Sequence, residues 1–156
     1  MKFTKTQLQQ AIQSETEIVA IWGAFQILKL EEETIREFLP FFLSSPFEDI
    51  KDVGIAKIAE FEDAEYAADI TRIFRLSEGQ LKFTAAFALS KFPNDFTASL
   101  IHKWFEQLIE SEQSTRVEFE AATYAYINVD RKSNFKEALN LLVSSQSDII
   151  KSSVLF

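Results

Sequence analysis

The chain contains no cysteine, only three glycines and three prolines, and one histidine among its 156 residues. Without cysteine, disulfides and thiolate metal sites are excluded. Scarce glycine and proline argue against an all-β protein, which needs turn residues at short intervals. The three scattered glycines form no phosphate-binding loop and no G-x-S-x-G turn. We therefore expect an α-helical protein that uses none of these common catalytic motifs.

Long apolar runs are also missing. No run approaches the ~20 residues that span a bilayer, and the start "MKFTKTQLQQAIQ" has no apolar signal-peptide core. The net charge is −8, and the basic residues are scattered along the sequence. Such a chain repels nucleic-acid phosphates unless it has a local basic stripe. We expect a cytoplasmic protein with no membrane and no nucleic-acid partner, and a single domain over residues 1–156.

Serines recur at intervals of 31 to 37 residues, at Ser14, Ser45, Ser77, Ser114 and Ser145. All but Ser114 are followed three residues later by an acidic residue or a glutamine. A serine at the N-cap accepts a hydrogen bond from a free backbone N–H, and the acidic or amide residue three positions later reaches back to the cap. The spacing predicts an internal repeat in which each of these serines begins a helix.

The segments after these serines share one pattern of apolar and small residues. Gly23, Gly54 and Ala85 occupy the same small-residue position. Glycine inside a helix costs about 1 kcal/mol relative to alanine, so its presence predicts close backbone packing at this position.

A second amphipathic helix follows each first helix. The sequence predicts a lone helix within residues 1–13 and second helices over residues 32–43, 64–76, 94–111 and 134–144. The repeats then run over about 14–44, 45–76, 77–113, 114–144 and, in part, 145–156. One such helix pair cannot bury its apolar face alone, whereas stacked pairs can. We expect about ten helices in antiparallel pairs.

The apolar and small positions that these segments share resemble those of HEAT-type repeats. The third copy, "LKFTAAFALSKF", matches the apolar, basic and small positions of that pattern best, and Ile50-Lys51 and Ile150-Lys151 repeat its apolar-basic pair. The family's usual proline in the first helix is absent, and Ala20 and Phe119 replace the basic residue in two copies. The resemblance implies an all-α fold: a right-handed α-α superhelix, or solenoid, of about four helix pairs with terminal capping helices.

The stretch "FLPFFLSSPF" holds four phenylalanines in ten residues. On a helical wheel, Phe38 and Phe42 join an apolar stripe that predicts core positions, while Phe41 points away from it. Pro40 is expected to kink or split the helix. We therefore hypothesise that Phe41 is an exposed anchor for a partner.

Three further aromatic residues lie opposite the apolar stripes of their helices: Phe83, Phe87 and Tyr124. Inner repeats are covered on both sides, so burial is the alternative for these three residues. Together with Phe41 they are the candidate partner-binding residues.

Catalytic chemistry has little support in the sequence. His102 lies between apolar neighbours and is expected to be a packed or surface residue. The acidic group Glu60, Glu62, Asp63 and Glu65 is interpreted as a solvated loop. We expect no catalytic residue, cofactor or metal.

Three functions remain open. The first is a non-enzymatic protein-binding scaffold or chaperone-like module, as the HEAT resemblance implies. A small acidic immunity or antitoxin-type inhibitor is a variant of it. The alternative is a phycobilin lyase or tetrapyrrole-handling chaperone, because that group also resembles HEAT repeats. Only under this alternative would the partner be a tetrapyrrole.

Overall fold

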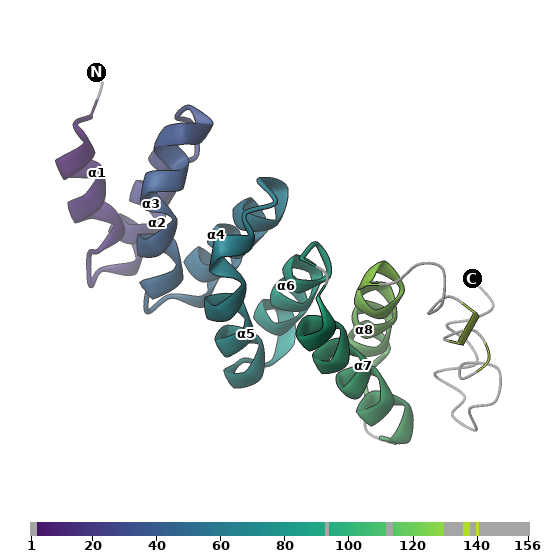
Figure 1. Cartoon of the computed structure of the whole chain (residues 1–156). Coiled ribbons are helices and arrows are strands. Elements are labelled where there is room, and N and C mark those ends of the chain that lie inside the picture. Colours follow the sequence, from purple (N-terminus) through teal and green to yellow (C-terminus); the bar gives the residue numbers. More distant parts are fainter. Residues whose placement is uncertain (1–2, 93, 112–113, 130–135, 138–139, 141–156) are drawn as a thin grey trace.

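The computed structural model describes residues 3–92, 94–111, 114–129, 136–137 and 140, and this part of the chain is all-α (Figure 1). It contains a short 3-10 helix, η1 (Ala64–Tyr66), and no strand. The α-helices are α1 (Lys5–Ile12), α2 (Glu17–Ile27), α3 (Glu32–Ser44), α4 (Glu48–Glu60), α5 (Ala67–Leu76), α6 (Gly79–Ser90), α7 (Asp95–Glu110) and α8 (Arg116–Val129). No described helix has both the length and the apolar character that crossing a bilayer requires.

The helices follow one another along the molecule in the order of the sequence, from α1 at one end to α8 near the other (Figure 1). Helices α4, α6 and α8 pack side by side in one row. Helix α3 packs closely against α4, α5 against α6, and α7 against α8. Each second helix of an expected repeat thus has its more extensive contact with the first helix that follows it. The row and the helices beside it create the grooves described below.

The predicted helices over 32–43, 64–76 and 94–111 correspond to α3, to η1 with α5, and to α7. The lone N-terminal helix corresponds to α1. Helix α3 continues past Pro40 as far as Ser44, so the expected split does not occur, and the Pro40 side chain is exposed. The helix expected over 134–144 and the partial repeat from residue 145 lie outside the residues described.

The predicted serine caps are wrong. Ser14 and Ser45 precede the N-caps of α2 and α4 by two residues, and each accepts a hydrogen bond from the backbone N–H two positions later. This is a serine turn that leads into the helix rather than a cap. Ser77 lies one residue before the N-cap of α6, and Ser114 donates its hydroxyl to the backbone carbonyl of Leu108. Ser145 lies outside the described residues.

Reciprocal caps are made by other residues. Thr4 and Gln7 cap α1, and Asn94 and Thr97 cap α7. Residue Thr115, directly before α8, accepts a hydrogen bond from the Glu118 N–H at 3.2 Å, and the Glu118 carboxylate accepts from the Thr115 N–H at 3.0 Å. These pairs satisfy backbone donors that a helix start leaves free.

The buried side chains form two clusters. The smaller, N-terminal cluster joins α1 and α2 to α3 and α4, with Ile12, Ile27 and Phe42 almost fully buried. The larger cluster extends from α3 to α8, and α6 supplies five of its residues: Leu81, Ala85, Ala86, Ala88 and Leu89. Helices α3 and α4 contribute to both clusters, so they join the two halves of the core.

Close backbone packing at the small-residue position is confirmed. A Cβ at Gly23 would lie 2.8 Å from the Ala11 Cβ and 2.8 Å from the backbone nitrogen of Ile12. At Gly54 it would lie 2.5 Å from the Cβ of Phe42. Ala85, at the same position of the predicted third repeat, is fully buried. Larger side chains would force these helices apart.

Candidate binding surfaces

Among the described residues, the largest group of exposed apolar side chains belongs to α2 and its surroundings. Within α2, Ile18 is 76% exposed and Phe25 is 63% exposed. We define the α2 surface as these two residues together with five other exposed apolar residues: Phe3, Val19, Ile21, Trp22 and Leu30. Soluble proteins expose single apolar residues routinely, whereas large groups of exposed apolar residues are typical of interaction sites.

The opposite side of α2 is buried against the rest of the protein. Ala20 and Ile27 are completely buried, and Gly23 brings the helix against α1. Because the sequence "EIVAIWGAFQI" is apolar at nearly every position, one side fills the core and the other faces outward. No other described element covers the outward side. An amphipathic helix would have placed polar residues there.

Aromatic rings strengthen the α2 surface. The Phe3 and Trp22 rings meet edge to face at 4.9 Å between centroids, and the Lys29 ammonium lies 5.9 Å from the Phe25 ring centroid. Exposed carboxylates of Glu15 and Glu17 lie at the N-terminal end of this helix. The surface is therefore apolar and aromatic, and Glu15 and Glu17 lie beside its N-terminal end.

Phe41 is half-buried and packs against the N-terminal core cluster, with its ring 6.0 Å from that of Phe38. The exposed anchor expected at this position is therefore only partly accessible. Phe38 and Phe42 are buried, as predicted from the helical wheel.

The other three candidates form two separate stacked pairs. Phe83 is half-buried and stacks on Trp104 of α7 at 6.3 Å. Phe87 is also half-buried and stacks on Tyr124 of α8 at 5.8 Å. Tyr124 remains 52% exposed. The four residues do not form one surface, because Phe41 belongs to the N-terminal cluster whereas Phe83 and Phe87 pack against the larger one.

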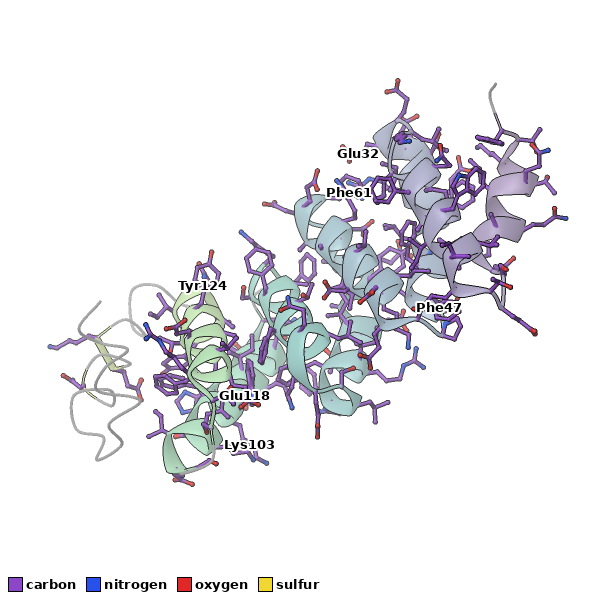
Figure 2. The ribbon with its side chains drawn as sticks, turned by 180° about the vertical axis from the view of Figure 1, so that it is seen from behind. Glu32, Phe47, Phe61, Lys103, Glu118 and Tyr124 are labelled. Atoms are coloured by element: carbon purple, nitrogen blue, oxygen red, sulfur yellow. The ribbon has the colours of Figure 1, made fainter. Side chains whose placement is uncertain are left out.

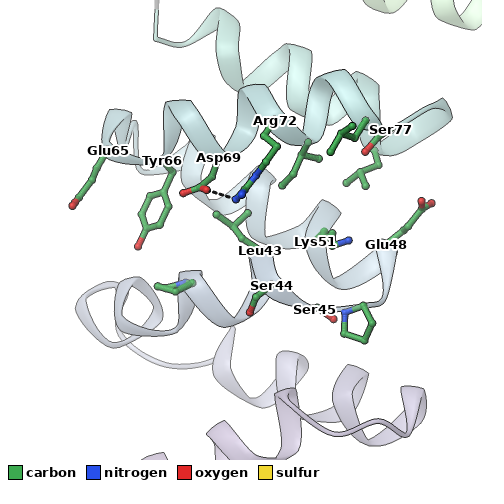
Figure 3. A pocket seen from close by; sticks show the side chains of 15 residues that line it. Leu43, Ser44, Ser45, Glu48, Lys51, Glu65, Tyr66, Asp69, Arg72 and Ser77 are labelled. Atoms are coloured by element: carbon green, nitrogen blue, oxygen red, sulfur yellow. Dashed lines mark hydrogen bonds and ion pairs between the residues drawn. The ribbon is translucent and has the colours of Figure 1, made fainter.

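A groove of about 900 Å³ lies between α3 and α5, with α4 and the start of α6 contributing to its lining. We call it the first groove. Leu43, Ile73 and Leu81 supply apolar lining, and Figure 3 shows Tyr66 and Asp69 on one side facing Ser44 on the other. Its charges are mixed, because acidic and basic side chains both line it: Glu48, Lys51, Glu65, Asp69 and Arg72.

Electrostatics at the first groove are largely balanced. Arg72 pairs with Asp69 at 2.6 Å (Figure 3). Burial raises the pKa of Tyr66, and the nearby carboxylates of Asp63 and Glu65 raise it further. The Tyr66 phenol therefore keeps its proton at neutral pH. The groove presents hydrogen-bonding groups beside apolar side chains.

Arg36 ties α3 to the turn after α4. Its guanidinium lies 4.6 Å from the Phe61 ring centroid and pairs with Glu32 at 2.6 Å and Asp63 at 2.7 Å. Glu32 and Phe61 lie toward the same side of the molecule in Figure 2. The hydrogen bond to Glu32 and the charges of Glu32 and Asp63 raise the pKa of Arg36. Asp63 and Glu60, from the predicted acidic loop, are thus in ion pairs, the latter with Lys57.

His102 has structural partners. Its Nε2 lies 3.0 Å from the Glu106 carboxylate, and its Nδ1 lies 3.2 Å from the Tyr126 hydroxyl. Tyr126 in turn donates to the Glu137 carboxylate at 3.0 Å. Within the described part of the chain, no three His, Asp or Glu side chains come together as a metal site would require.

No family model, no curated protein and no solved structure matches the chain.

The α2 surface is absent from the sequence-based candidates. The signal was present in "IVAIWGAF", whose apolar residues surround the helix. Such a helix is usually buried on all sides, so its composition alone does not distinguish a core helix from a binding surface.

Proposed function

We propose that the protein is a HEAT-like helical repeat protein that binds another protein without catalysing a reaction, and that the α2 surface is its docking site. The exposed apolar side of α2 is the observation that carries the proposal. The row formed by α4, α6 and α8 and the close contacts at Gly23 and Gly54 support the repeat architecture, because stacked repeats bury continuous cores in this way.

The chemistry of the α2 surface indicates the kind of partner. Trp22 and Phe25 offer large apolar contact area, and residues of this type dominate the binding energy of many interfaces. Exposed acidic residues lie before and after the helix, at Glu15, Glu31 and Glu32. A partner segment with an apolar face and flanking basic residues complements both features.

Two substitutions at equivalent positions test this proposal. Ile18 and Val117 are each the second residue of their helix, both are β-branched, and they are 76% and 60% exposed. We expect Ile18→Asp to weaken binding of the natural partner at least tenfold, and Val117→Asp to change it no more than twofold.

The partner is first captured from the native source with the unaltered chain, then purified, and its dissociation constant is measured for each variant. Circular dichroism verifies that both variants remain folded. Equal losses for the two variants, or unchanged affinity for Ile18→Asp, would show that the α2 surface is not the docking site.

A further inference from the structure

A second groove, of about 390 Å³, lies between α5 and α7 beside α6. Its lining combines three aromatic rings with three basic side chains: Phe74, Phe96, Trp104, Arg75, Lys82 and Lys103. Ser99 and Gln107 add hydrogen-bonding groups, and no carboxylate lines the groove. Figure 2 shows Lys103, in this groove, well separated from Tyr124 on α8.

Two of the three cations of the second groove, Arg75 and Lys82, lie against aromatic rings. The Lys82 ammonium lies 5.1 Å from the Phe74 ring centroid and 5.8 Å from that of Trp104. The Arg75 guanidinium lies 5.4 Å from the Phe96 ring centroid. None of the three basic side chains takes part in an ion pair with a described residue.

This arrangement contrasts with the first groove, where Arg72 is paired with Asp69. In a chain of net charge −8, most of the surface repels anions. Three cations gathered around one groove without a carboxylate create a local site that attracts them. Ring faces hold Arg75 and Lys82 in place, and an anion can still approach them, because a ring does not neutralise their charge.

The volume and the rings narrow the class of ligand. About 390 Å³ falls at the lower end of the ~300–1,000 Å³ typical of small-molecule sites. Phe74 and Trp104 are buried and meet edge to face at 5.2 Å, while Phe96 is 55% exposed. The buried rings provide an apolar floor, and the exposed ring can cover a flat ligand.

We propose that the second groove binds a small organic anion, a carboxylate or phosphate attached to a flat ring. Arg75, Lys82 and Lys103 bind the anionic group by charge-assisted hydrogen bonds, and the Trp104 and Phe96 rings contact the ring of the ligand. This site is independent of the α2 surface, which belongs to the other core cluster.

Four probes test the proposal by isothermal titration calorimetry: 1-naphthyl phosphate, 1-naphthoate, 1-naphthylmethanol and inorganic phosphate. We expect at least one naphthyl anion to bind at least tenfold more tightly than both the neutral alcohol and inorganic phosphate. Comparing the two naphthyl anions distinguishes a carboxylate from a phosphate ligand. Raising the salt concentration should weaken this binding.

Substitutions then place the binding in the groove. Lys82→Gln and Lys103→Gln should each weaken it about tenfold, since each removes a charged hydrogen-bond donor. Lys91→Gln is the matched control. Lys91 follows α6, its ammonium lies 5.1 Å from the Phe87 ring centroid, and it lies outside the groove.

Trp104 provides a direct readout. The chain has two tryptophans, Trp22 and Trp104. In a Trp22→Phe variant, a saturable change in tryptophan emission on adding the naphthyl anion reports binding at the second groove. The proposal is overturned if neither anion binds saturably, or if the alcohol or inorganic phosphate binds as tightly. It is also overturned if Lys91→Gln weakens binding as much as Lys82→Gln, or if Trp104 emission does not change.

Discussion

Gly54 in α4 lies directly against Phe42 in α3, so closely that a Cβ at residue 54 would lie 2.5 Å from the Cβ of Phe42. The Cβ of Phe42 is fixed to the backbone, so no rotamer change can relieve such a clash. The contact brings the two helices together at a point where α3 joins both halves of the core.

A leucine at this position should therefore destabilise the protein. We expect Gly54→Leu to lower the free energy of unfolding by about 1–3 kcal/mol through overpacking, although leucine has the better helix propensity. The control is Ala56→Leu, at an exposed position of the same helix, which should stay within about 0.5 kcal/mol of the unaltered protein. Urea unfolding measures both. A Gly54→Leu protein as stable as the control would contradict the tight contact.

The two neighbouring phenylalanines of α3 should respond differently to truncation. Phe42 is fully buried, and Phe42→Ala should cost about 3–5 kcal/mol because it leaves a cavity. Phe41 is half-buried, so Phe41→Ala should cost about 1–2 kcal/mol, in proportion to the apolar area it loses. Chemical denaturation of the two variants gives the comparison. Equal losses would mean that Phe41 is as much a core residue as Phe42.

Two residues allow a direct test of the helix caps. Asn94 makes a cap hydrogen bond, whereas Ser77 was predicted to be a cap and is not one. Asn94 accepts a hydrogen bond from the Thr97 N–H at 2.9 Å, so Asn94→Ala should cost about 1 kcal/mol. Ser77 was a predicted cap but precedes the N-cap of α6, and Ser77→Ala should cost less than about 0.5 kcal/mol. Thermal unfolding followed by circular dichroism distinguishes the two. A larger loss of stability for Ser77→Ala than for Asn94→Ala would show that Ser77 does cap α6.

Tyr66 should make stability depend on alkaline pH. Its pKa is raised above the ordinary value of 10.0 by burial and by nearby carboxylates. The folded protein therefore keeps the phenolic proton over a pH interval in which the unfolded chain has already lost it. This contribution to stability is complete below pH 10.0 and is lost as the pH rises through the folded pKa.

We expect Tyr66→Phe to lose stability less steeply above pH 10.0 than the unaltered protein does. Unfolding free energies measured across this range provide the test. If Tyr66→Phe loses stability as steeply as the unaltered protein above this pH, the phenol does not couple its protonation to folding.

The helical fold could be predicted because its signals are local. The apolar spacing of the second helices located α3, α5 and α7 closely, and the two glycines predicted the close contacts that Gly23 and Gly54 make. The caps failed because a serine two residues ahead of a helix start can make a turn hydrogen bond, as Ser45 does, while S-x-x-E looks the same in sequence. Thr115 was overlooked although Glu118 follows it at the capping-box spacing.

The candidate binding surfaces depend on tertiary packing, which the spacing of apolar residues in the sequence does not reveal. Whether the apolar residues of α2 are covered depends on which helices lie beside it, and Ile18 is exposed because none of the described ones does. The second groove combines Arg75, Lys82 and Lys103 from three helices. Scattered basic residues gave no stripe in the sequence, yet folding brings these three to one site.

The division of the core into two clusters has a consequence for local opening of the molecule. Helices α1 and α2 belong to the smaller cluster alone, whereas α6 packs against α4, α5, α7 and α8. Opening the N-terminal pair exposes few buried residues and leaves the larger cluster intact, so the backbone amides of α1 and α2 should exchange with deuterium earlier than those of α6. A partner that covers Ile18 and Trp22 would add contacts to these two helices. Its binding should therefore slow the deuterium exchange of the α1 and α2 amides.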